Sequence, residues 1–116
     1  MTRKQQVIWL LDELREFPGC ERLFVAWQTP PDLHTPDQSA RTLSISPRDA
    51  VDEIDVPDNA VISVGCSGAV AASEADSIGC AAKARAELPW ASDVAVRLNK
   101  IDGAAAYTYQ VECRIG

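Results

Sequence analysis

The chain has little of what usually marks a metal centre or a membrane segment. It contains one histidine and four cysteines, and none of the cysteines form a Cys-x-x-Cys pair. Structural zinc sites are usually built from paired ligands, so the spacing predicts neither a metal nor another cofactor. The apolar run from Val7 to Leu11 is too short for a signal peptide or a membrane span. We therefore expect a cytoplasmic protein with no membrane association. Its reduced cysteines are Cys20, Cys66, Cys80 and Cys113.

Positive charge is also scarce. The chain has 11 Lys and Arg residues against 17 Asp and Glu residues, which gives a formal net charge of −6. Residues 41–80 carry most of this imbalance, with 2 basic and 7 acidic side chains. Proteins that bind a phosphate backbone need clustered Lys and Arg. Direct binding to nucleic acid is therefore not expected.

The C-terminal residues 93–115 have the pattern of a β-hairpin. Asp102-Gly103 is a favoured pair for a two-residue type I′ turn, and this turn would place Leu98 opposite Tyr107. The same register puts the apolar side chains of both strands on one face and the polar ones on the other. We expect a hairpin with one core face and one wetter face, the latter including Ala95 and Thr108.

The remaining pattern predicts a single domain over residues 1–116, of the α+β class. We expect a two-layer sandwich in which helices pack on one face of a mostly antiparallel sheet of four to five strands. Helix signals, such as the cap at Thr2 and the prolines after each segment, predict helices over 3–16, 48–54 and 74–88. Strands are expected over 23–28, 42–45 and 60–65, before the hairpin.

Residues 29–40 have no periodicity and contain three prolines, so we expect one long loop there. His34 lies in this loop and is the one side chain expected to titrate near neutral pH. No patterned neighbour is available to orient it as a catalytic base, so we interpret it as a surface residue.

Cys66 is the candidate for an enzymatic residue. It lies between glycines after a predicted strand, where a thiol could be ionised by a following helix. The helix signal starts only at Ser73, however, and no histidine is close in sequence. The segment also lacks the ending of a phosphate-binding loop. The sequence therefore favours a protein that is not an enzyme, and it indicates no catalytic residue other than the candidate Cys66.

The strongest functional signal is the cluster of acids between two predicted strands. These residues would project a negative field and attract a basic partner protein. Trp9 points away from the buried stripe of the first helix and is a second candidate anchor. The acidic cluster consists of Asp49, Asp52, Glu53, Asp55 and Asp58.

The leading hypothesis is a non-enzymatic module that binds a protein with a basic surface. By analogy of size and charge, it could act as a small phage-type inhibitor or nucleic-acid mimic on a nucleic-acid-binding complex. Two alternatives stay open. One is a small thiol-dependent enzyme centred on Cys66, and the other is a structural subunit of a homo-oligomer that associates through the wetter hairpin face.

Overall fold

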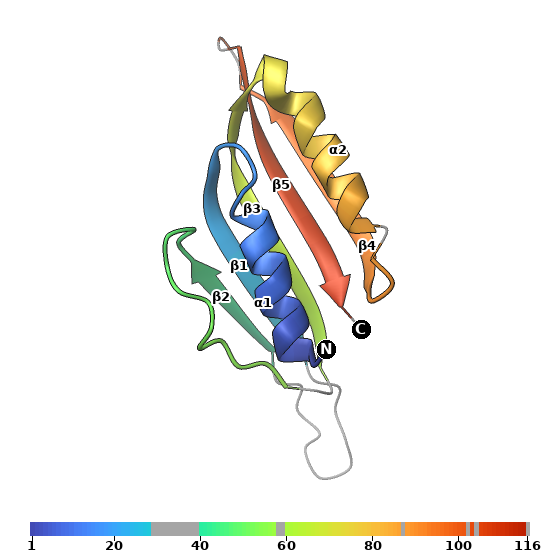
Figure 1. The fold of residues 1–116 in the computed structure, drawn as a ribbon. Helices are drawn as coiled ribbons and strands as arrows, with labels where there is room; N and C mark the ends of the chain where they lie inside the picture. Colours follow the sequence, from blue (N-terminus) through green and yellow to red (C-terminus); the bar gives the residue numbers. More distant parts are fainter. Residues whose placement is uncertain (29–39, 58–59, 87, 102, 104, 116) are drawn as a thin grey trace.

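The computed structural model describes residues 1–28, 40–57, 60–86, 88–101, 103 and 105–115. Its centre is a five-stranded antiparallel sheet in the order β2-β1-β3-β5-β4, and both helices lie on one side of it (Figure 1). The predicted α+β class and two-layer architecture are confirmed. The elements are α1 (Arg3–Leu14), β1 (Cys20–Gln28), β2 (Ala40–Ile45), β3 (Val61–Ala71), a 3-10 turn η1 (Ala72–Glu74), α2 (Ala75–Ala86), β4 (Ala91–Lys100) and β5 (Ala106–Ile115).

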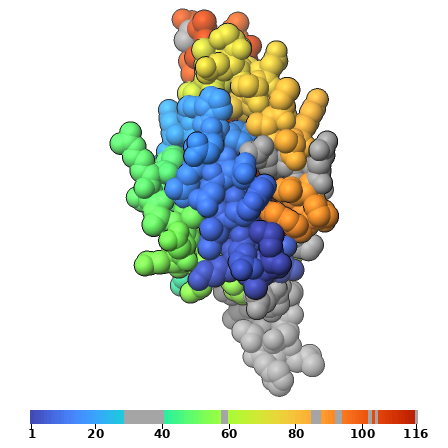
Figure 2. Space-filling view, in the orientation of Figure 1, coloured from blue at the N-terminus to red at the C-terminus, as the bar shows by residue number. Residues whose placement is uncertain are grey.

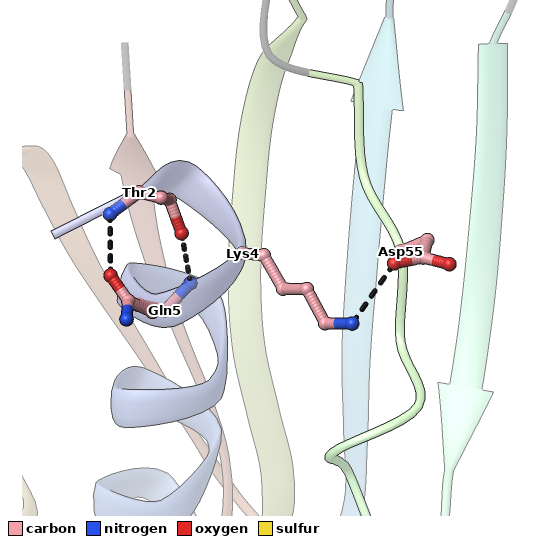
Figure 3. A network of polar contacts seen from close by, with 4 residues as sticks. All are labelled: Thr2, Lys4, Gln5 and Asp55. Carbon is pink, nitrogen blue, oxygen red and sulfur yellow. Dashed lines mark hydrogen bonds and ion pairs between the residues drawn. The ribbon is translucent and has the colours of Figure 1, made fainter.

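Helix α1 begins with the predicted cap at Thr2. The Thr2 hydroxyl accepts a hydrogen bond from the Gln5 amide at 3.1 Å, and the Gln5 side-chain oxygen accepts one from the Thr2 amide at 2.8 Å (Figure 3). This reciprocal pair satisfies two amide donors that the first turn would otherwise leave unpaired. The helix ends at Leu14, before the predicted boundary. Its buried stripe is the predicted one, Val7, Leu10, Leu11 and Leu14.

The core lies between the helices and the sheet. Alternate residues of β1, including Leu23 and Val25, point into it, and the same holds for the odd-numbered residues of β5 from Tyr109 to Ile115. Because β1 pairs with β2 and β3, it lies inside the sheet, as its apolar residues on both faces predict. On the face without helices, Phe24 lies opposite Gly65. Within the described residues, neither helix is long and apolar enough to span a bilayer.

The predicted end of the central strand at residue 65 is wrong. Strand β3 continues to Ala71, so the sequence Gly65-Cys66-Ser67-Gly68 lies within the sheet and not in a turn. The glycines allow close approach there: a Cβ added at Gly68 would lie 2.1 Å from the Gly19 carbonyl oxygen. Glycine inside a strand often marks such a contact between backbones. The following helix contacts the sheet through Ile78 and Ala82, whereas Ala84 is exposed.

The C-terminal hairpin forms, but its register differs from the prediction by two residues. Leu98 pairs with Tyr109 and not with Tyr107, and the Ile101 amide donates to the Ala106 carbonyl at 3.0 Å. An even shift leaves every side chain on its predicted face, so the alternation pattern could not distinguish the two registers. Asp102 and residue 104 of the predicted turn lie outside the described residues.

Candidate functional site

The acidic residues lie on the segment that joins β2 to the start of the central strand, and we call residues 46–57 the acidic segment. The predicted helix over 48–54 is wrong. Two separate turns take its place: the Asp49 amide donates to the Ser46 carbonyl at 3.0 Å, and the Ile54 amide donates to the Val51 carbonyl at 3.2 Å. The Ser46 hydroxyl accepts a hydrogen bond from the Arg48 amide at 3.4 Å.

Burial of apolar side chains explains why the helix does not form. A helix of this length gains few hydrogen bonds for the cost of its first turn. The observed path through the two turns places Val51 in the core with 2% of its surface exposed, and it brings Ile54 and Val56 against the same core. The three apolar side chains anchor the acidic segment beside α1. Figure 2 shows this segment in green next to the blue helix.

The anchors direct the carboxylates outward. Asp49, Asp52 and Glu53 are exposed and form no ion pair within the described residues. Asp55 is 86% exposed, and its Oδ1 accepts a hydrogen bond from Lys4 Nζ of α1 at 3.0 Å (Figure 3). Exposed pairs of this kind contribute about 0–1 kcal/mol, so Lys4 fixes the end of the segment only weakly. Asp58, the fifth predicted member, lies outside the described residues.

Truncating the main anchor should loosen the segment selectively. We expect Val51→Ala to lower the free energy of unfolding by about 2 kcal/mol, because it removes buried methyl groups and leaves a cavity. Amide exchange should speed up over residues 46–57 and stay unchanged in β5. Denaturant titration and hydrogen exchange mass spectrometry measure the two effects. Val61, which is 49% exposed, is the matched control, and Val61→Ala should leave both measurements nearly unchanged.

Trp9 is separate from the acidic segment. Its ring meets the ring of Trp90 edge to face, with centroids 5.7 Å apart, and 36% of Trp9 remains exposed. Lys4, which contacts the acidic segment, is about 140° from Trp9 around the helix axis. The structure therefore does not bring Trp9 and the carboxylates into one patch. No pattern in the sequence predicts that Trp90 is the neighbour of Trp9.

Cys66 lies in the middle of β3 with no exposed surface. The nearby Tyr109 hydroxyl donates to the Pro18 carbonyl at 2.8 Å, and burial is the main cause that raises the pKa of this tyrosine above its usual value. Burial also raises the pKa of Cys20, whose thiol lies 3.8 Å from the Arg22 carbonyl. A buried thiol in a strand lacks the access that a nucleophile requires. The geometry gives no support to catalysis at Cys66.

Thiol alkylation of the native protein should follow this burial. We expect exposed Cys80 to react first with iodoacetamide at neutral pH, and Cys20 to react more slowly because burial raises its pKa. Cys66 and Cys113 are buried and should react only after unfolding. Peptide mass spectrometry over a time course gives the order. Early modification of Cys66 would contradict the placement of this thiol in the core and would reopen the enzyme hypothesis.

The described surface also has hollows away from the acidic segment. A shallow hollow of about 270 Å³ lies at one end of the sheet, between residues such as Gln28, Thr42 and Arg114. Ala95 and Thr108, predicted for the wetter hairpin face, are exposed on the hairpin. Among the described residues, no three His, Cys, Asp or Glu side chains gather in an arrangement that could hold a metal ion. His34 lies outside the described residues.

The geometry of the described residues is the basis for assigning a function, because comparison with known proteins gives no functional information. Searches against family models, curated protein sequences and solved structures give no significant match.

Proposed function

We propose that the protein is a non-enzymatic binding module whose acidic segment engages a basic surface of a partner protein. The observation that supports the proposal is that the segment combines a buried apolar anchor with exposed carboxylates. Val51 holds the backbone in the core, while Asp49, Asp52 and Glu53 are exposed beside it. Carboxylates held on an anchored backbone lose less conformational freedom on binding than carboxylates on a free loop.

The proposed partner surface is a groove or patch lined with Lys and Arg. Four described carboxylates lie within residues 49–55, and Lys4 neutralises part of the charge of Asp55 alone. Negative charge at this density speeds encounter with a positive surface at low ionic strength. Such a segment could occupy a groove where a nucleic-acid-binding complex holds phosphates. This is how a small inhibitor or nucleic-acid mimic would act.

The experiment is affinity capture from a lysate of the source organism at two salt concentrations. With the tagged protein as bait, we expect a specific partner with a basic surface at about 50 mM salt and much less of it at about 300 mM, since salt screens exposed charges. The bait with Val51→Asp, which places a charge at the anchor, should recover less of the same partner. Capture that is equal at both salt concentrations would contradict the proposal.

A further inference from the structure

Strand β4 forms one edge of the sheet, and a row of apolar side chains lies along its face next to α2. Its neighbour in the sheet is β5, which pairs with one side of it only. Val94 and Val96 are partly buried, and Leu98 is 41% exposed. These three side chains and α2 residues line a groove of about 390 Å³. Edge strands of this length are usually protected, because their free backbone groups are a template for another strand.

The hydrogen-bond pattern shows which backbone groups of β4 point outward. The Ile101 amide donates to the Ala106 carbonyl of β5, and the Thr108 hydroxyl donates to the Asn99 carbonyl at 3.4 Å. In an antiparallel pair the residues that bond to one neighbour alternate along the strand. The odd-numbered residues therefore face β5. The amide and carbonyl groups of Val96 and Leu98 point to the open side. Val94 lies at the register shift between Ser92 and Ala95, where the alternation is interrupted.

We infer that this edge binds a second copy of the same chain, in a two-fold dimer where β4 pairs with β4 of the partner. The register with Val96 at the two-fold axis fits best. It pairs Val96 with its own copy and Val94 with Leu98 of the partner subunit, and it joins the two β4 edges by backbone hydrogen bonds. Arg97 then lies opposite Ala95, so no like charges meet across the axis. Moving the axis to Arg97 would place two arginines face to face.

Helix α2 supports the same two-fold arrangement. Gly79 and Lys83 line the groove on the side of the helix that faces the sheet edge. Asp76 lies on the same stripe as Lys83, seven residues earlier, and both are exposed. When two copies of α2 run antiparallel beside the axis, Asp76 of each copy lies opposite Lys83 of the other. A Cβ added at Gly79 would meet nothing within 4 Å, so the partner helix has room to approach there.

The other sheet edge does not fit a second copy as well. Strand β2 is shorter, and the acidic segment follows it directly. Two copies that met at β2 would bring their acidic segments together, and like charges at close range oppose association. The dimer through β4 leaves both acidic segments free on the outer flanks. The inference therefore does not depend on the proposed partner of those segments.

Sedimentation equilibrium of the purified full chain tests the dimer. We expect a reversible monomer-dimer equilibrium with a dissociation constant in the micromolar range, and Leu98→Lys should raise this constant at least about tenfold, because it places a charge in the apolar row. The control is Val61→Lys, which changes a comparably exposed apolar residue away from β4 and should leave the constant unchanged. Circular dichroism confirms that each variant is folded.

A charge swap tests the register even if Leu98→Lys fails to fold. Asp76→Lys and Lys83→Asp should each weaken the dimer, and the double variant should restore it, since only the two-fold arrangement brings these positions together. A chain that stays monomeric at about 200 μM would overturn the inference at any plausible affinity. The inference would also be overturned if Leu98→Lys left the dissociation constant unchanged, or if the effects of the two charge reversals on this constant were additive.

Discussion

Gly68→Ala should destabilise the protein by about 3 kcal/mol, a large effect for the addition of one methyl group. The added Cβ would lie 2.1 Å from the Gly19 carbonyl oxygen and 2.8 Å from its carbon, and neither backbone atom can move away cheaply. The same carbonyl accepts a hydrogen bond from the Ala69 amide at 3.2 Å, which the displacement would break. Denaturant titration gives the change in the free energy of unfolding.

Gly79→Ala is the matched control for this prediction. The substitution adds the same methyl group, but nothing lies within 4 Å of it and the residue is inside α2. Alanine is a better helix former than glycine, so we expect stabilisation by about 0.5–1 kcal/mol. The protein concentration is kept low so that association does not contribute. Equal effects of the two substitutions would contradict the close contact between Gly19 and Gly68.

Neutralising the acidic segment should have the largest effect on binding. We expect the triple change Asp49→Asn, Asp52→Asn and Glu53→Gln to weaken the captured complex by about 100-fold, mainly through slower association. The three side chains are exposed, so the fold should tolerate their amides. Surface plasmon resonance with the captured partner measures both rate constants. An unchanged association rate would contradict the assignment of the segment as the binding surface.

A second triple variant separates local charge from net charge. Glu16→Gln, Glu21→Gln and Glu74→Gln also removes three negative charges, and these residues are exposed elsewhere on the molecule. This variant should change the affinity by no more than a few fold, because exposed charges farther away than about 8–10 Å are largely screened at physiological salt. Equal losses in both triples would indicate that net charge alone drives binding.

Local signals predicted most of the fold because they agree with one another. The cap at Thr2 and the apolar stripe of α1 both specify the first helix, and the alternation in β1 and β5 specifies which face is buried. The predictions were wrong where contacts between residues distant in sequence override the local sequence signal. Gly65 and Gly68 resemble turn residues in isolation, but in the sheet they accommodate Phe24 and Gly19 at close range.

The candidate site was predicted in composition but not in conformation. The sequence predicts that the carboxylates share one segment, but it also predicts a helix over 48–54, which does not form. The decisive factor was the burial of Val51, Ile54 and Val56 against residues distant in sequence. The contact between Trp9 and Trp90 could not be predicted for the same reason, because the two residues are distant in sequence.

The most direct test of the account is the salt dependence of the dissociation constant for the captured partner, measured for the wild type and the neutralised Asp49, Asp52 and Glu53 triple. We expect the wild-type complex to weaken steeply between about 50 and 300 mM salt, and the complex of the triple to be weak and nearly insensitive to salt. Equal salt dependence in the two proteins would contradict the claim that the acidic segment carries the interaction.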